Sequence, residues 1–335
     1  MINRIKRFFQ TPKARAIVLM YHRIANLETD PWQLAVSPEH FDSQIKMLTD
    51  KFQVLPVDNL HTQLAGRQIK DHSIYITFDD AYMDNYIYAK PILEKYGCPA
   101  TFFVPTHFIG KQQQFWWDEL EAILLHSEQL PSTLNLVVDK QPVVYHLDAE
   151  QLTDDVKRRQ TLWHWPEPAP TSQCELYLKL WEKLKPMPYP NIVDLMDQIK
   201  TWAQYFPKDI SERTAMNITQ LNEVSSNKLF SLGLHTQTHP ELASHSKDVQ
   251  SEEIRGCLEY LQQHNYAPIS AIAYPYGSTD DNTLLATAEN HIDLGFTTRP
   301  DVITNDSSLH SLGRYQVNNY GGAELELKLN SWFNN

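Results

Sequence analysis

Polar residues that could carry acid–base or metal chemistry stand directly after three apolar, β-branched stretches of the sequence. They are His22 after residues 17–21, Asp79 and Asp80 after residues 74–78, and His235 with His239 after residues 229–234. In a fold of parallel strands, the carboxyl ends of the strands meet at one edge, where such folds keep their active sites. We therefore expect these side chains to converge on one site.

The spacing of His235 and His239 favours a metal site. Two imidazoles four residues apart can face one point where the chain turns, and a carboxylate from Asp79 or Asp80 would supply a third ligand. Two nitrogens and one oxygen suit zinc, cobalt, iron or nickel and leave positions open for water or substrate. Because the chain has 14 histidines, a chance pair of surface histidines is an alternative.

The adjacent carboxylates of Asp79 and Asp80 could take different tasks. If one is a metal ligand, the other lies beside the metal at hydrogen-bond range of a water, as a general base must. The alternative is a pair of helix N-caps that serve backbone N–H groups. A non-haem iron oxygenase also uses two histidines and one carboxylate, but the second aspartate suits hydrolysis better.

Short apolar runs alternate with helical patterns, which predicts an α/β fold with mostly parallel strands. Strands are expected at 16–21, 73–78, 100–104, 229–234, 270–274 and 294–297. Helices are expected from Ser37-Pro38-Glu39, over 82–96 with an end at Gly97, after Ser251, and from about Asp281.

The alternation lapses in residues 111–217, which hold six of the eight tryptophans, at 116, 117, 163, 165, 181 and 202. We interpret this segment as a mainly helical insertion in a domain formed by 1–110 and 218–335. Packing in the insertion core is expected for most of these tryptophans, with one or two at a substrate groove.

Composition limits the classes of binding partner and the expected cellular location. Acidic residues exceed basic ones by 41 − 29 = 12, which disfavours nucleic acid. Three widely spaced cysteines predict reduced thiols. The basic N-terminus has no apolar run long enough for a signal peptide, so we expect a cytoplasmic protein that could contact the inner membrane face peripherally. No protein partner is predicted.

Three local sequences resemble the motifs of polysaccharide deacetylases, the NodB-homology or carbohydrate esterase family four group. Residues 77–82, TFDDAY, resemble the usual T-F-D-D-G; 235–240, HTQTHP, are similar to H-[ST]-x-x-H-P; and 273–277, AYPYG, are similar to the third motif. Order and local sequence agree for all three, and the resemblance covers roughly 14–110 and 225–317. It implies a distorted (β/α) barrel and metal-dependent removal of N-acetyl groups from a sugar.

By the same resemblance, Asp80, His235 and His239 are ligands of a divalent metal, zinc first, and Asp79 is the general base. Residues 18–24, VLMYHRI, resemble the N-terminal Y-H motif of circularly permuted exopolysaccharide deacetylases, where that histidine is the acid. His22 is therefore the expected acid, with a strand-end histidine bonded to a local carbonyl as the alternative.

The chain departs from the family pattern at several places. The motif glycine is replaced by Ala81, which is tolerable if φ is negative there. The third motif lacks the arginine that often orients the base, and Arg314 is a candidate replacement or a surface ion-pair residue. His310 in Leu309-His310-Ser311 is a poor copy of the usual C-terminal L-x-H motif.

Residues expected to contact the substrate are Tyr82, through its backbone N–H at the oxyanion, Tyr276, through its ring, and Arg314. The expected substrate is an N-acetylated amino sugar in a polysaccharide, oligosaccharide or glycan precursor. The alternatives are a deformylase or another non-peptide C–N hydrolase of the same fold, and an inactive glycan-binding relative. The four residues Asp79, Asp80, His235 and His239 argue against loss of catalysis.

Overall fold

The computed structural model describes residues 14–127, 129–138, 140–148, 153–207, 210 and 213–334. The basic N-terminal stretch assigned to membrane contact lies almost wholly outside these residues. None of the described helices is long and apolar enough to cross a membrane. The three cysteines, Cys98, Cys174 and Cys257, are buried and free.

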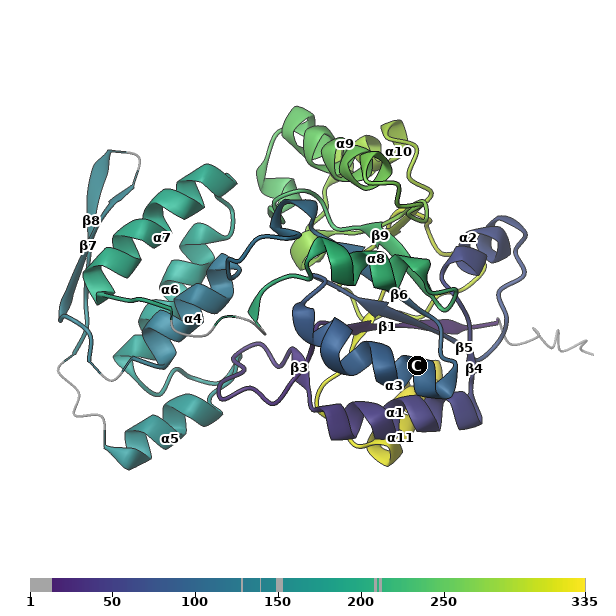
Figure 1. The fold of residues 1–335 in the computed structure, drawn as a ribbon, viewed down its shortest axis with the longest axis horizontal. Helices are drawn as coiled ribbons and strands as arrows, with labels where there is room; N and C mark the ends of the chain where they lie inside the picture. Colours follow the sequence, from purple (N-terminus) through teal and green to yellow (C-terminus); the bar gives the residue numbers. More distant parts are fainter. Residues whose placement is uncertain are drawn as a thin grey trace, which may run out of the picture.

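An eight-stranded sheet in which every strand pair is parallel forms the centre of the fold (Figure 1). Its order is β11-β10-β9-β6-β5-β1-β12, and β4 pairs with β5. The strands are β1 (Ala16–Tyr21), β4 (Gln53–Val54), β5 (Ser73–Phe78), β6 (Ala100–Val104), β9 (Phe230–Leu234), β10 (Ala271–Ala273), β11 (Leu294–Phe296) and β12 (Tyr315–Gln316). All residues of β1, β5 and β6 are buried, as expected for strands covered on both faces.

The segment that ends in β12 links the two ends of the sheet, because it contacts β11 at one end and pairs with β1 at the other. Leu312 forms a parallel bridge with Phe296 of β11, and Tyr315 pairs with Leu19 of β1. The sheet is therefore curled into a distorted (β/α) barrel, which confirms the predicted fold class. Arg314 lies on this closing segment, which places its side chain close to the end of β5.

Helices cover the outside of the sheet (Figure 1). Two further strands, β2 (Arg23–Ile24) and β3 (Ala35–Val36), pair with each other after β1. The helices are α1 (Pro38–Lys51), α2 (Asp58–Ala65), the π-helix η1 (Asn85–Ala89), α3 (Lys90–Tyr96), α8 (Ile218–Ser226), α9 (Lys247–Gln263), α10 (Asp281–Glu289) and α11 (Gly322–Asn334), with short 3-10 turns η2 (Thr106–Phe108), η4 (Leu242–Ser244) and η5 (Pro275–Gly277).

Local sequence signals set most of these boundaries. The Ser37 side chain accepts a hydrogen bond from the His40 N–H, with Pro38 as the first residue of α1. Gly97 ends α3 with φ 60° and ψ 32°, the left-handed conformation that glycine adopts without strain. The helix expected after Ser251 begins four residues earlier, at Lys247, and in this added turn the buried Gln250 side chain donates a hydrogen bond to the His245 carbonyl.

The segment predicted as an insertion contains four helices and a β-hairpin among its described residues, at the left of Figure 1. These are α4 (Trp116–Leu125), α5 (Asp154–Leu162), α6 (Ser172–Leu184), α7 (Tyr189–Ala203) and the antiparallel pair β7 (Thr133–Val138) and β8 (Gln141–His146). The segment is therefore mainly helical, as predicted, and the hairpin is its one described β element. Leu134, Leu136 and Val138 form its buried face, and Gln198 of α7 bonds both the N–H and the carbonyl of Val137.

Candidate active site

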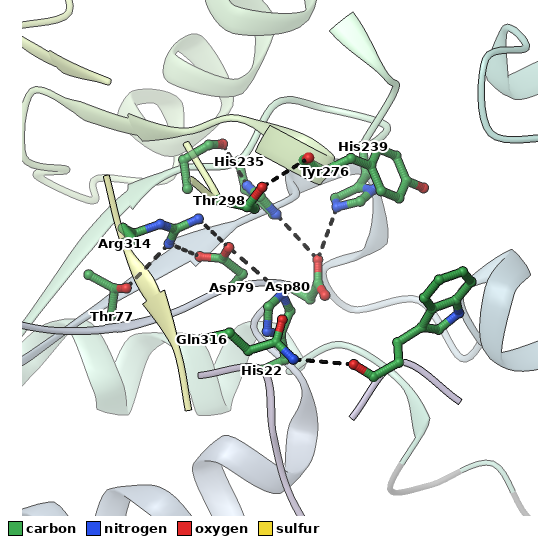
Figure 2. Close-up of polar contacts among 12 residues, drawn as sticks. His22, Thr77, Asp79, Asp80, His235, His239, Tyr276, Thr298, Arg314 and Gln316 are labelled. Carbon is green, nitrogen blue, oxygen red and sulfur yellow. Dashed lines mark hydrogen bonds and ion pairs between the residues drawn. The ribbon is translucent and has the colours of Figure 1, made fainter. Parts of the chain in front are cut away.

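The polar residues predicted to converge follow the carboxyl ends of β1, β5 and β9 and lie around one cavity of about 650 Å³. Alternation along β5 directs Tyr75, Thr77 and then Asp79 to the inner side of the barrel. The cavity is lined by His22, Asp79, Asp80, His235, His239 and Tyr276, whereas Tyr82 and Arg314 are not among its lining residues. Figure 2 shows the cluster around Asp79 and Asp80.

One carboxylate oxygen faces two imidazole nitrogens. The Oδ1 of Asp80 lies 3.3 Å from the Nε2 of His235 and 3.3 Å from the Nε2 of His239, and one ligand atom from each residue lies within 4.8 Å of the others. All three residues are buried, and Asp80 Oδ1 has no hydrogen-bond partner. A buried carboxylate oxygen without a donor is costly, so the position is suited to a cation.

The hydrogen bond of His235 also supports a cation site. Its Nδ1 donates a hydrogen bond to the Ala273 carbonyl at 2.7 Å, so that Nε2 is the ring nitrogen that faces Asp80 and could bind a cation. Burial lowers the pKa of His239 to about 3 and keeps that ring neutral. Burial opposes protonation of His235, but the Asp79 and Asp80 carboxylates outweigh it and raise the pKa of that ring. A divalent cation would take the place of this proton, so one nitrogen from each imidazole and the Asp80 carboxylate form a donor set that fits a metal ion.

Asp79 is held by a buried arginine. Arg314 donates from Nη1 to Oδ1 and from Nη2 to Oδ2 of Asp79, both at 2.7 Å, and from Nη1 to the Thr77 hydroxyl at 3.2 Å. Burial opposes ionisation of Asp79, but Arg314 outweighs it and holds the pKa of that carboxyl well below its usual value. Asp79 is therefore held ionised and in a fixed orientation.

The expectation that Arg314 contacts substrate is wrong. Its side chain is 0% exposed, its Nε donates to the Thr297 carbonyl, and its guanidinium lies near the rings of Phe103 and Phe296. Arg314 lies beneath Asp79 rather than in the cavity. The closing segment brings it there, so a residue far from the third motif occupies the place beside the carboxylate.

Ala81 has a left-handed backbone, contrary to the expected negative φ. The φ angles of Asp80 and Ala81 are 68° and 50°, and this tight turn reverses the chain after β5. A motif glycine would adopt this conformation freely, whereas alanine is strained in it. The turn is stabilised from the insertion side, where Met216 N–H bonds the Ala81 carbonyl and Met83 N–H bonds the Thr214 carbonyl.

His22 and His310 occupy very different places. The Nε2 of His22 lies 3.9 Å from Oδ2 of Asp79, inside the cavity, and its Nδ1 is buried without a hydrogen-bond partner. His310 instead contacts the Ile292 carbonyl through Nε2 at 2.9 Å. Of the two histidines considered for the acid, only His22 adjoins the carboxylate pair.

A family model matches more than half of the chain. The family model for polysaccharide deacetylases matches residues 66–141 and 181–295. This chain belongs to the polysaccharide deacetylase family. The match enters both ends of the predicted insertion, beyond the limits of the motif resemblance, and leaves out residues 142–180.

Individual relatives agree with the family. The chain is 29% identical over 156 residues to YxkH of Bacillus subtilis (strain 168), whose name places it provisionally among polysaccharide deacetylases; the alignment covers 44% of this chain and 54% of YxkH. It is 37% identical over 114 residues to the poly-beta-1,6-N-acetyl-D-glucosamine N-deacetylase of Staphylococcus aureus (strain MSSA476), covering 29% of this chain and 38% of that enzyme. The chain thus spans about half or less of these curated relatives.

A likeness in fold covers nearly the whole chain. A Streptococcus pyogenes deacetylase, PplD in complex with acetate, superposes with a TM-score of 0.54 at 22% identity, covering 95% of this chain and 99% of that one. At this identity the likeness concerns the fold of the deacetylase domain.

The side chain of Tyr82 does not line the cavity. This side chain is buried, donating a hydrogen bond to Asp118 at 2.9 Å and accepting one from Trp117 at 2.8 Å. The Trp117 ring in turn lies 4.6 Å from that of His239, so the insertion helix α4 supports a candidate ligand. Sequence reasoning named Trp117 only as a tryptophan of the insertion, because no motif marks it.

Tyr276 stands beside the candidate metal ligands. Its ring is 4.7 Å from that of His239 at an interplanar angle of 77°, and its φ is 58°. Gly277 follows with φ 67°, where a Cβ would overlap the hydroxyl and backbone nitrogen of Thr298. The close approach of Thr298 therefore explains the glycine of the third motif.

Proposed function

We propose that this protein is a metal-dependent hydrolase that removes N-acetyl groups from an amino sugar of a glycan. The observation that carries the proposal is the juxtaposition of two carboxylates with unlike partners: Asp80 faces two imidazoles, and Asp79 is held by a guanidinium. Membership in the polysaccharide deacetylase family and the name of the staphylococcal relative support the substrate class.

Asp80, His235 and His239 would hold a divalent metal, zinc first by its preference for nitrogen and oxygen ligands, with cobalt, nickel or iron as the other choices. When bound, the metal supplies Lewis acidity, which polarises the amide carbonyl and makes water more acidic. This role is needed because an amide carbonyl is poorly electrophilic.

The remaining steps fall to the chain's own residues. Asp79, kept ionised by Arg314, accepts the proton of the attacking water. His22, 3.9 Å from Asp79, donates a proton to the departing amine, which otherwise leaves poorly. The backbone N–H of Tyr82, next after the left-handed turn, is the proposed donor to the oxyanion.

Two substitutions divide these roles. Asp79→Asn should lower turnover by about 10²–10⁴-fold while the protein keeps its metal. His235→Ala should lose both metal and turnover. Acetate release from β-1,6-linked N-acetylglucosamine oligomers, measured together with metal content by elemental analysis, tests both. Loss of metal in Asp79→Asn with retention in His235→Ala would refute the assignment.

A further inference from the structure

His22 is held through its main chain rather than through its ring. Two other histidines of the cavity have a fixed ring: His235 is oriented by the hydrogen bond from its Nδ1, and His239 packs against the Trp117 ring. The Nδ1 of His22 has no hydrogen-bond partner, and its Nε2 lies 3.9 Å from Asp79, beyond hydrogen-bond distance. The position of the His22 ring therefore depends on what fixes the backbone at this residue.

Two adjacent residues after the left-handed turn hold that backbone. The Nδ2 of Asn85 donates one hydrogen bond to the His22 carbonyl and one to Oδ1 of Asp84, both at 2.8 Å. The same Oδ1 accepts a hydrogen bond from the Ile24 N–H at 3.1 Å. Asp84 and Asn85 are fully buried, so water does not compete for these bonds. The main chain that carries His22 is thus held at two points, two residues apart.

Arg23 holds the same carboxylate from the opposite side. Its Nε donates to Oδ2 of Asp84 at 2.5 Å, its guanidinium lies 4.1 Å from the centre of the Tyr82 ring, and its Nη1 lies 3.8 Å from Asp118 of α4. Arg23 is buried, and a guanidinium bound on several sides has little freedom to move. We call Arg23, Asp84 and Asn85 the backbone clamp.

Two features of Asn85 are not explained by stability alone. Its Oδ1 is buried without a hydrogen-bond partner, which costs free energy. Asn85 also begins η1, and π-helical turns are rare and occur frequently at functional sites. Both features favour a functional role for the amide nitrogen that is directed at the His22 carbonyl.

The backbone clamp and the carboxylate pair belong to one short segment. Asp84 follows Asp80 by four residues, so the stretch that carries Asp79 also holds His22. Figure 2 shows His22 beside Asp79 and Asp80. A proton donor must lie within hydrogen-bond reach of the atom that it protonates, and a displacement of about 1 Å can cost about 10²-fold in rate. Fixing the backbone at His22 is therefore worth a large factor in turnover.

We propose that Asn85 is a positioning residue, which places the His22 imidazole opposite Asp79 by holding the His22 carbonyl. The inference rests on the proposed function, which assigns protonation of the departing amine to His22. As the C–N bond breaks, its electron pair goes to nitrogen, which takes a proton from His22; the acetyl group leaves as acetic acid, and the proton that Asp79 accepted from water replaces the one that His22 lost. Asn85 does not line the cavity and is not a candidate metal ligand, so it acts through His22.

The test uses two acetyl donors whose leaving groups differ in their need for a proton. The amine of a β-1,6-linked N-acetylglucosamine oligomer must be protonated to leave, whereas 4-nitrophenyl acetate releases its phenolate without a proton. Asn85→Ala should lower kcat/KM for the oligomer about 10–100-fold and kcat/KM for the ester by less than about threefold, with unchanged metal content. A loss of folded protein or of metal would instead lower both values by the same factor.

A double variant and a matched control complete the test. His22→Ala should lower kcat/KM for the oligomer about 10²–10⁴-fold, and adding Asn85→Ala should cause no further loss, because no acid remains to be positioned. The control is Gln160→Ala, which removes another buried amide that donates to a main-chain carbonyl, that of Leu125 at 2.8 Å. It should leave the oligomer-to-ester ratio unchanged. Equal losses for the two substrates in Asn85→Ala, or additive losses in the double variant, would overturn the inference.

Two further measurements cover the cases in which Asn85→Ala does not fold or the oligomer is not a substrate. Arg23→Lys keeps a positive charge facing Asp84 but loses the Nε donor, so it should show the same selective loss for the oligomer to a smaller degree. If the wild type releases no acetate from the oligomer, the proposed function fails, and crystal structures decide the positioning role. A His22 ring that moves away from Asp79 in Asn85→Ala but not in Gln160→Ala supports it, and an unmoved ring rejects it.

Discussion

Replacing Arg314 by methionine would leave Asp79 as a buried carboxylate without its counter-ion. Methionine has a similar length but cannot donate, so the two bonds to Asp79, the bond to Thr77 and the bond to the Thr297 carbonyl are all lost. Asp79 is 2% exposed, so water cannot easily take over. The structure therefore predicts a large loss of stability and a displaced Asp79 carboxylate.

The expected magnitude follows from burial. Removing one partner of a buried ion pair costs about 3–5 kcal/mol, because the remaining charge stays in a poorly solvating site. An unfolding entropy of about 2.1 cal/mol/K per residue gives roughly 0.7 kcal/mol/K for 335 residues, so Tm should fall by about 4–7 °C. Asp79→Asn should also destabilise, because it leaves Arg314 buried without its carboxylate.

The double variant is the decisive measurement. Arg314→Met with Asp79→Asn leaves no uncompensated charge, so it should lose about 2–3 kcal/mol less than the sum of the two single variants. Urea unfolding at pH 7, followed by tryptophan fluorescence and far-ultraviolet circular dichroism in the presence of a chelator, measures all four proteins without a contribution from metal binding.

The pH dependence has a definite sign. The pKa of Asp79 is depressed in the folded state, so the stabilisation is present above its unfolded-state value of about 4 and is lost as the pH falls. Additive losses in the double variant at pH 7, or a single variant as stable as the wild type, would show that Arg314 and Asp79 are not coupled as described.

Two other perturbations test the fold around the site. Ala81→Gly removes the strain of a left-handed alanine, which is about 1–2 kcal/mol. This gain roughly offsets the loss of buried methyl surface and the added entropy of the unfolded chain, so the free energy of unfolding should stay within about 1 kcal/mol of the wild type. Ala89→Gly, at an equally buried helical position, should lower the free energy of unfolding by about 2 kcal/mol. Equal losses in the two variants would contradict backbone strain at Ala81. Burial raises the pKa of Glu121 to about 8, so the folded protein retains a proton that the unfolded chain releases above about pH 4.5. The free energy of unfolding should therefore decrease as the pH rises from about 4.5 to about 8, by at most about 1.4 kcal/mol per pH unit. Glu121→Gln should flatten that slope in denaturant titrations at pH 5, 6, 7 and 8, and an unchanged slope would assign the titration elsewhere.

The local sequence determined most of the barrel. Residues 16–21, 73–78 and 100–104 form strands with the predicted limits, because continuous apolar, β-branched runs are stable only where both faces are covered. The helix at Ser37-Pro38 and the end at Gly97 follow from capping, which acts within a few residues. The triad Asp80, His235 and His239 was predicted from motif order, and the structure brings its ligand atoms together.

Contacts between distant segments could not be predicted from local patterns. Whether Arg314 faced water or Asp79 depended on the path of the closing segment between β11 and β1, which pairing of remote strands decides. The sign of φ at Ala81 depended on the turn bonded to residues 214 and 216. Likewise, the sequence separates Trp32 from Trp181 by nearly half the chain. Only the packing of the insertion against the barrel loop sets their rings 4.3 Å apart, because side-chain contact between remote segments depends on how whole elements pack.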